Sequence, residues 1–141
     1  MSKAVIIYWS GTGNTESMAN AILEGAREVN SDTVIFNVSD ISAASAATYD
    51  TLILGCPAMG AEVLEESEFE PFFTELEPNL TGKKVALFGS YGWGDGEWMR
   101  NWEERVNGVG ANLVCEGLMC NEVPDSDVLD ACRVLGKKAA E

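Results

Sequence analysis

Residues 5–15 run Val5-Ile6-Ile7-Tyr8-Trp9-Ser10-Gly11-Thr12-Gly13-Asn14-Thr15, where apolar and aromatic side chains pass into glycines and hydroxyls. The continuous apolar run over 5–9 predicts a buried parallel strand, because such strands are covered on both faces. Residues 15–28 then space their apolar side chains as a helix does. The junction therefore places backbone N–H groups at a helix N-terminus, where partial positive charge favours a phosphate.

This first loop, residues 10–15, lacks the charges that phosphate chemistry requires. None of the nine Lys and Arg residues lies within it, whereas phosphoryl transfer needs cations near the moving group. Glu16 stands where a G-x-G-x-x-G loop has its third glycine, and no G-K-[ST] follows. We therefore predict a loop that anchors a phosphate without cleaving it. Because Glu16 would repel that phosphate, we expect its side chain to point away.

Further apolar strands and amphipathic helices alternate along the chain. We expect strands at 33–38, 51–55, 85–89 and 113–118, and helices at 41–49, 67–76, 97–107 and 126–140. This alternation predicts an α/β fold, with a parallel sheet of five strands and helices on both faces. The 141 residues contain no evident linker or repeat, so we expect a single domain over 1–141.

Two more loops, residues 56–62 and 90–96, should open at the same edge of the sheet as loop one. In Pro57-Ala58-Met59-Gly60-Ala61-Glu62, the Met59 thioether suits an aromatic ring, and Gly60 lets a peptide flip. In Ser90-Tyr91-Gly92-Trp93-Gly94-Asp95, Trp93 is placed to stack on an aromatic ligand. Each of these side chains alone would also suit ordinary packing. We expect Trp98 and Trp102 to lie in the core.

Composition narrows the classes of function. Acidic residues outnumber basic ones by 23 to 9, giving a formal net charge of −14, which disfavours nucleic acid and anionic membranes as partners. The chain has no histidine, so most hydrolytic mechanisms lose their usual general base. The four cysteines form no C-x-x-C pair, and we expect reduced, partly buried thiols and no metal site. The glutamate-rich stretch 62–77 favours an acidic face for a basic protein partner.

Other phosphate-binding classes fit the chain less well. A receiver-like module would need clustered acids after its first strand and a lysine near its last, and a phosphatase loop would need Cys-x5-Arg; neither pattern is present. No apolar run approaches the ~20 residues that span a membrane. Because residues 1–3 lead directly into a strand, we expect no signal peptide and a cytoplasmic protein.

The chain resembles the short-chain flavodoxins, small electron carriers that bind FMN. The matching segments are Y-W-S-G-T-G-N-T-E at 8–16, G-C-P-A-M-G at 55–60, E-E-S-E-F-E-P-F at 65–72 and G-K-K-V-A-L-F-G-S-Y-G-W-G-D-G at 82–96. The resemblance implies a flavodoxin-like doubly wound sheet of order 2-1-3-4-5. It also implies a low-potential one-electron carrier, not an enzyme, that shuttles non-covalently bound FMN between semiquinone and anionic hydroquinone. Its partners would be the basic faces of redox enzymes such as reductases and ferredoxin-dependent oxidoreductases.

The resemblance assigns a part of the cofactor to each loop. Residues 10–15 would hold the FMN phosphate, with the Trp9 indole nearby. Met59 and Trp93 would flank the isoalloxazine on its two faces. The Gly60 carbonyl would turn to accept a hydrogen bond from N5–H of the semiquinone. The other residues expected around the cofactor are Pro57, Ala58, Ser90 and Tyr91.

The edges of the ring receive the remaining assignments. Glu62 would lie at the pyrimidine edge, and the backbone around Gly92 and Gly94 would meet the N1/O2 side with Asp95 close by. Ala61 departs from the family, because many members have a hydrogen-bonding side chain there. The acidic side chains around the ring should make the reduced flavin a strong reductant.

Two questions stay open at the level of sequence. The segment 117–122 would meet the dimethylbenzene or ribityl side, but its motif is weak. The alternative function is an FMN-dependent NAD(P)H:quinone reductase, which needs a nicotinamide pocket and usually extra segments or a tetramer. This compact chain shows neither, and we expect a monomer.

Overall fold

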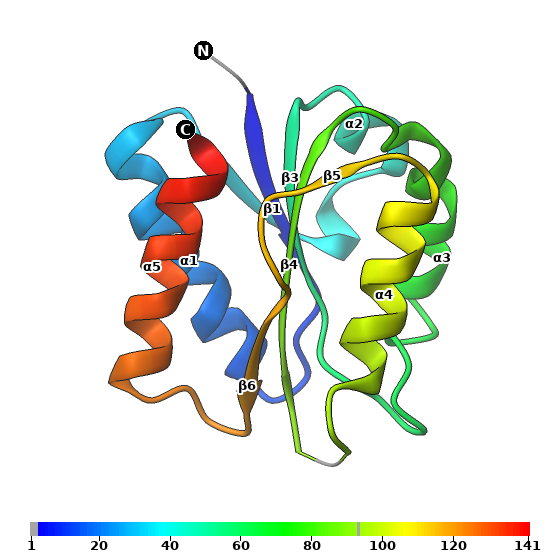
Figure 1. The fold of residues 1–141 in the computed structure, drawn as a ribbon, viewed down its shortest axis with the longest axis vertical. Coiled ribbons are helices and arrows are strands. Elements are labelled where there is room, and N and C mark those ends of the chain that lie inside the picture. The colour runs from blue at the N-terminus through cyan, green and yellow to red at the C-terminus, as the bar shows by residue number, and fades with distance from the viewer. Residues whose placement is uncertain (1–2, 93) are drawn as a thin grey trace.

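A computed structural model of the chain describes residues 3–92 and 94–141. It contains one parallel sheet of strand order β2-β1-β3-β4-β5, with a further strand, β6, paired to β4. Figure 1 shows this sheet between two layers of helices. The predicted strand order and the helices on both faces are confirmed. The strands are β1 (Ala4–Tyr8), β2 (Val34–Asn37), β3 (Thr51–Gly55), β4 (Lys84–Tyr91), β5 (Asn112–Leu113) and β6 (Leu118–Asn121).

Five α-helices surround the sheet in the described part of the chain. They are α1 (Asn14–Val29), α2 (Ala43–Ala46), α3 (Phe69–Leu76), α4 (Glu97–Gly108) and α5 (Ser126–Ala140), joined by the 3₁₀ turns η1 (Val38–Asp40) and η2 (Glu77–Asn79). The helix expected over 41–49 is shorter in the structure, where α2 covers only Ala43–Ala46. The Lys83 ammonium then donates to the carbonyls of Ala47 and Tyr49 at 2.7 and 2.6 Å, which fixes the chain after that helix.

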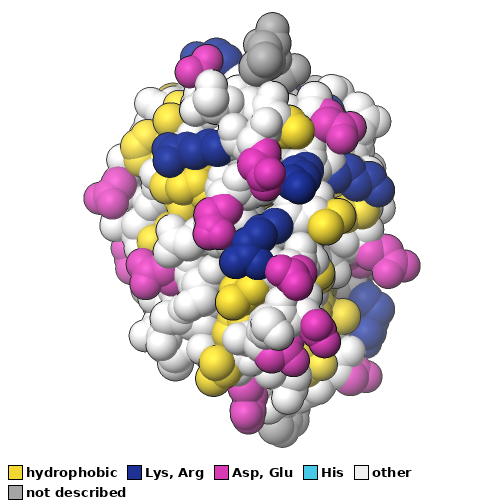
Figure 2. All heavy atoms as spheres, turned by 90° about the vertical axis from the view of Figure 1, so that its left-hand side faces the viewer, with side chains coloured by type: hydrophobic (Ala, Val, Ile, Leu, Met, Phe, Trp, Pro, Cys, Tyr) yellow, Lys and Arg dark blue, Asp and Glu magenta, His cyan; other side chains and the backbone are white. Residues whose placement is uncertain are grey.

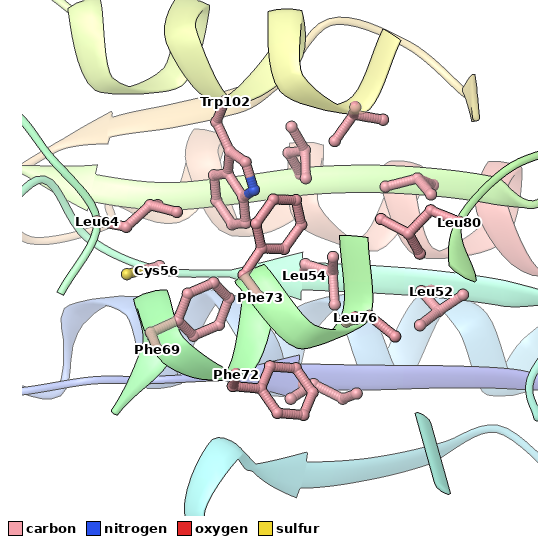
Figure 3. Packing of buried hydrophobic residues seen from close by; sticks show 14 of the residues in the cluster. Leu52, Leu54, Cys56, Leu64, Phe69, Phe72, Phe73, Leu76, Leu80 and Trp102 are labelled. Atoms are coloured by element: carbon pink, nitrogen blue, oxygen red, sulfur yellow. The ribbon is translucent and has the colours of Figure 1, made fainter. Parts of the chain in front are cut away.

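Alternate side chains of each strand enter two separate cores. Leu52 and Leu54 of β3 pack toward α3 and α4, whereas Ile53 packs toward α1 and α5. This is the two-sided burial expected of parallel strands. In the first core, the Trp102 ring lies edge-on to Phe69 and Phe73, with centroid distances of 5.5 and 5.8 Å. Figure 3 shows these rings between the sheet and the two helices.

The second face is closed by two helices in close backbone contact. A methyl group built on Gly136 of α5 would lie 2.1 Å from the Ile22 carbonyl oxygen, and one on Gly25 of α1 would meet the Arg133 carbonyl at 1.9 Å. Only glycine permits this approach. Arg133 and Lys137 add ion pairs to acidic side chains of α1, and Figure 2 shows basic and acidic groups side by side on this face.

The predicted fifth strand, 113–118, is wrong in its bounds. β5 pairs with the N-terminal half of β4 and β6 pairs with its C-terminal half, so the sheet has six strands, not five. Lys84 pairs with Asn112 and Phe88 with Leu118, so the outer strand uses two more residues than β4 over the same length. The break is fixed at Gly117, whose N–H donates to Glu103 Oε2 at 2.7 Å. The Met99 side chain leaves no room there for a Cβ.

Candidate functional site

Three loops meet at the carboxyl ends of the strands and enclose a cavity of about 230 Å³. Loop one follows β1 and loop two follows β3. Loop three overlaps the end of β4, which runs to Tyr91 and so extends two residues beyond the predicted strand 85–89. All three contribute to the wall, as the sequence predicts for one edge of a parallel sheet. The described lining residues are Trp9, Ser10, Gly11, Thr12, Asn14, Thr15, Pro57, Ala58, Met59, Ser90, Tyr91, Gly92 and Glu122.

Loop one presents the start of α1 to this cavity. Gly13 takes a left-handed conformation, with φ of 96°, and no side chain of that residue caps the helix. The Ser10 hydroxyl accepts the N–H groups of Gly13 and Glu16 at 3.1 and 3.2 Å. A serine oxygen that accepts in this way still has its own hydrogen to donate. The helix terminus therefore faces the cavity with neutral groups only.

Glu16 turns toward Tyr8, as the sequence requires if loop one is to accept an anion. The Tyr8 hydroxyl donates to Glu16 Oε2 at 3.0 Å. Burial of the phenol, followed by this bond, raises the pKa of Tyr8 above its ordinary value. The Glu16 carboxylate is not part of the cavity wall.

A buried pair of hydroxyls ties loop one to loop three. Thr15 Oγ1 and Ser90 Oγ lie 3.1 Å apart, and the Ser90 N–H also donates to Thr15 Oγ1 at 3.4 Å. The two residues are 1 % and 5 % exposed. Because a buried polar pair is costly to leave unsatisfied, this contact fixes the distance between the two loops.

Loop two forms a narrow hairpin that carries Gly60 at its tip. Met59 and Val63 exchange two backbone hydrogen bonds of 2.8 and 3.0 Å. Gly60 has a φ of 52°, and a methyl group there would meet nothing within 4 Å. The constraint at this position is therefore conformational and not steric. Met59, at the base of this hairpin, lines the cavity.

Glu62 has a role that sequence reasoning missed. Its side chain is buried, and Oε1 accepts the N–H groups of Asp95, Gly96 and Glu97 at 3.1, 3.1 and 3.2 Å. These amides form the start of α4, so the carboxylate joins loop two to loop three. Glu62 holds a left-handed φ of 56°, a conformation that costs a non-glycine residue about 1 kcal/mol.

A second glutamate occupies the start of α3 in the same way. Glu65 accepts the N–H groups of Ser67, Glu68 and Phe69 at 2.8 to 2.9 Å, together with the Ser67 hydroxyl. Burial alone would raise the pKa of this carboxyl, but the four hydrogen bonds outweigh it and lower the pKa. Glu65 is consequently a fixed anion beneath loop two.

Several predicted site residues do not line the cavity. Trp93 lies outside the described residues. Glu122, which follows β6 with a φ of 62°, lines the cavity and was not singled out from the sequence beyond its weak segment. A non-glycine residue with positive φ leaves no clear signature in one sequence. The predicted residues away from the wall are Gly13, Gly60, Ala61, Glu62, Gly94 and Asp95.

The acidic stretch 62–77 is less free than its composition suggests. Glu70 and Glu77 both pair with Arg105, at 2.8 and 3.2 Å. Glu62, Glu65 and Glu68 also accept hydrogen bonds, so five of the glutamates in this stretch are engaged within the fold. Glu66, Glu68 and Glu75 are exposed to solvent. Outside this stretch, Arg100 of α4 folds back on Asp95, with 3.0 Å between Nη2 and Oδ1. The sequence separation of five residues gave no signal for that pair.

Comparison with known proteins agrees with this geometry. The sequence profile described as "Flavodoxin" matches residues 6–136. The flavodoxin of Clostridium beijerinckii is 56 % identical over 96 % of this chain and 97 % of its own length. The flavodoxin of Megasphaera elsdenii is 48 % identical over the same shares of the two chains. A solution structure of the two-electron reduced Megasphaera protein superimposes with a TM-score of 0.85, covering 97 % of this chain and 98 % of that one.

The chain belongs to the flavodoxin family. It is a low-potential electron carrier that binds FMN, and it is an electron-transfer protein and not an enzyme, which decides against the quinone reductase alternative. The residues present fit this cofactor. The open start of α1 and the hydroxyls of loop one suit a phosphate, and the apolar wall from Ala58, Met59 and Tyr91 suits an aromatic ring. No helix in residues 3–92 and 94–141 is long and apolar enough to cross a membrane.

Proposed function

We propose that this flavodoxin holds FMN in the cavity between its three loops and exchanges single electrons with enzymes that present basic faces. Bound FMN supplies the one-electron chemistry, and the protein supplies binding and electrostatics. The observation that supports the proposal best is the start of α1, which borders the cavity while the carboxylate of its first turn, Glu16, turns away to Tyr8. A phosphate dianion is the complement of such a terminus.

The phosphate end of the site is formed by loop one. Ser10, Thr12, Asn14 and Thr15 line the cavity with hydroxyl and amide groups. Their side chains and the N–H groups of the first turn of α1 would hold the phosphate without a formal positive charge. Neutral donors of this kind bind an anion while leaving it chemically intact, which is what a permanently bound cofactor requires.

The ring end is formed by loops two and three. Met59 would cover one ring face, and Trp93, as the resemblance implies, the other. The hairpin between Met59 and Val63 holds the Gly60 peptide at its tip. Since Gly60 lacks a Cβ, its peptide turns at little energetic cost. Its carbonyl would then accept a hydrogen bond from a ring N–H that is present in one oxidation level of the cofactor and absent in another.

The basic-partner proposal rests on the acidic side chains that remain exposed. Glu66, Glu68 and Glu75 are exposed, and the net charge is −14. An acidic surface attracts a basic one during diffusional encounter, and salt weakens that attraction. Reduction by a partner enzyme should therefore slow as ionic strength rises. The monomeric state, the single domain and the cytoplasmic location expected from the sequence stay predictions.

A stepwise reductive titration followed by visible spectroscopy tests the proposal. We expect the parent to hold much of its flavin at the one-electron level before full bleaching. Gly60→Ala should lower that maximum, because alanine disfavours the positive φ at this tip. Gly108→Ala is the matched control, since Gly108 ends α4 with free space around it and no positive φ. Equal one-electron maxima in the parent and Gly60→Ala would overturn the role of Gly60. A protein that does not take up added FMN would overturn the site itself.

A further inference from the structure

The Trp9 indole spans the gap between the phosphate loop and the acidic segment before α3. Its ring lines the cavity, and a methyl group built on Gly11 would lie 3.0 Å from Trp9 Cη2. The benzene edge of the indole therefore rests against the second residue of loop one. The backbone N–H of Trp9 donates to the Gly55 carbonyl at 3.0 Å, so the main chain at this point is fixed by β3.

The opposite edge of the indole is bound to Glu68. Trp9 Nε1–H donates to Glu68 Oε1 at 3.2 Å, although the two residues are 59 positions apart in the chain. No function described above uses this contact. A hydrogen bond to a carboxylate is stronger than one between neutral groups, and it leaves the indole with one preferred orientation against Gly11.

Glu68 is well placed to act as a fixed acceptor. Its own N–H donates to Glu65 Oε1 at 2.8 Å, and it precedes the first residue of α3. That helix is anchored by Phe69, which is fully buried against Trp102. Figure 3 shows α3 pressed onto the sheet through its phenylalanines. The carboxylate that meets Trp9 therefore stands on a rigid base.

From these contacts we propose that Glu68 is a positioning residue for the phosphate end of the site. It holds the indole of Trp9 against Gly11 and so keeps loop one in the shape that receives a phosphate. The inference rests on the proposed function, in that FMN must bind in this cavity. Because loop one meets only the phosphate, Glu68 contributes to the preference for FMN over riboflavin, which has the same ring and ribityl chain without a phosphate.

Because Glu68 is negatively charged, the direction in which its removal changes FMN affinity distinguishes a positioning role from a charge effect. A carboxylate near a phosphate dianion repels it, so removing the charge by itself strengthens FMN binding. Loss of the indole contact has the opposite effect. Glu66 is an exposed acid two positions away, and Glu66→Ala measures the charge effect alone. Glu68→Gln removes the charge while keeping an oxygen that accepts the indole N–H.

Dissociation constants of FMN and riboflavin, measured by fluorescence titration of the apoproteins, test the proposal. Glu68→Ala should weaken FMN binding about five- to tenfold and leave riboflavin within about twofold of the parent. Trp9→Phe, which lacks the N–H, should do the same, and in the Trp9→Phe background Glu68→Ala should cause no further weakening of FMN binding. Glu68→Gln and Glu66→Ala should bind FMN as well as the parent or better.

Three results would overturn the inference. These are equal losses for FMN and riboflavin, tighter FMN binding by Glu68→Ala, or additive effects of Glu68→Ala and Trp9→Phe. The Trp9→Phe and Glu68→Gln variants keep the test intact if Glu68→Ala does not fold. Failure of the proposed function looks different, because the parent itself would then show no preference for FMN over riboflavin.

Discussion

Helices α1 and α4 begin at the same edge of the sheet and in the same way, yet their first turns face different partners. Each follows a left-handed glycine with a φ of 96°, Gly13 for α1 and Gly96 for α4, and neither glycine provides a capping side chain. The amides at the start of α4 converge on the Glu62 carboxylate. Those of α1 face the cavity, where Ser10 offers only a neutral oxygen.

The difference shows how the chain reserves one helix terminus for a ligand. A helix N-terminus carries partial positive charge and favours an anion. The chain supplies that anion to α4 through Glu62 and to α3 through Glu65, both from loop two or the residues just after it. For α1 no described carboxylate accepts the first amides, because Glu16 of its first turn binds Tyr8 instead, and the anion has to come with the cofactor.

Removing the internal anion of α4 should have the largest effect. Glu62→Ala leaves three amides of loop three without their acceptor, and we expect a loss of about 2–3 kcal/mol in the free energy of unfolding. Glu62→Gln keeps the accepting oxygen and should lose about 1 kcal/mol. Urea denaturation of the apoproteins measures both values. A Glu62→Ala variant as stable as the exposed control Glu66→Ala would contradict this account of α4.

The internal anion of α3 should show itself as a pH dependence. The pKa of Glu65 is lower in the folded protein than in the unfolded chain, where it lies near ~4.3. Its contribution to stability is therefore complete above that unfolded value and is lost as pH falls through the folded one. Stability measured from about pH 6 to about pH 3 should fall more steeply in the parent than in Glu65→Gln. Parallel curves for the two proteins would exclude Glu65 as the source.

The open terminus of α1 should respond to an anion from solution. Inorganic phosphate should stabilise the apoprotein by about 1.4 kcal/mol at roughly ten times its dissociation constant, raising the melting temperature by about 5 °C. Thr12→Asp places a carboxylate at this mouth of the cavity and should abolish the stabilisation. Sodium chloride at equal ionic strength is the control. Protection by both salts alike, or protection that survives in Thr12→Asp, would locate the anion elsewhere.

The neutral acceptor in loop one should matter least to folding. Ser10→Ala removes the oxygen that accepts two amide hydrogens, and we expect a loss of about 0.5–1 kcal/mol from the apoprotein. The same change should weaken FMN binding, since the hydroxyl hydrogen is lost as well. Calorimetry of the apoprotein and a flavin titration separate the two effects. A loss as large as that of Glu62→Ala would remove the contrast between α1 and α4.

The open terminus was predictable from the sequence, whereas the filled ones were not. Residues 5–15 carry their information locally, in a buried run, two glycines and a set of hydroxyls. The structure has residues 5–8 in β1 and all of residues 9–15 except Gly13 on the cavity wall. Glu62 lies more than thirty residues before the amides that it binds. It opens the glutamate-rich stretch 62–77, so composition suggested a solvated acidic face. Such a bond depends on how two loops meet, which no periodicity within either loop encodes.

The edge of the sheet shows the same limit. Residues 113–118 have the apolar character of a strand, and only the pairing with β4 determines that the segment between β5 and β6 contains two more residues than the stretch of β4 beside it. Glu103 and Met99 of α4 fix that segment at Gly117. Helix and strand meet there through tertiary contacts that leave no local pattern.

The segment between β5 and β6 is also a place where the chain should tolerate an insertion. β5 is held by Lys84 and Val85, and β6 by Phe88 to Tyr91, so each ladder keeps its register whatever the length of chain between them. Lengthening a loop is thermodynamically mild, at about 0.6 kcal/mol for each doubling. Extra residues between Cys115 and Glu116 would therefore extend outward without realigning the sheet. A peptide or reporter domain inserted there would be fused to the electron carrier without changing the three cofactor loops.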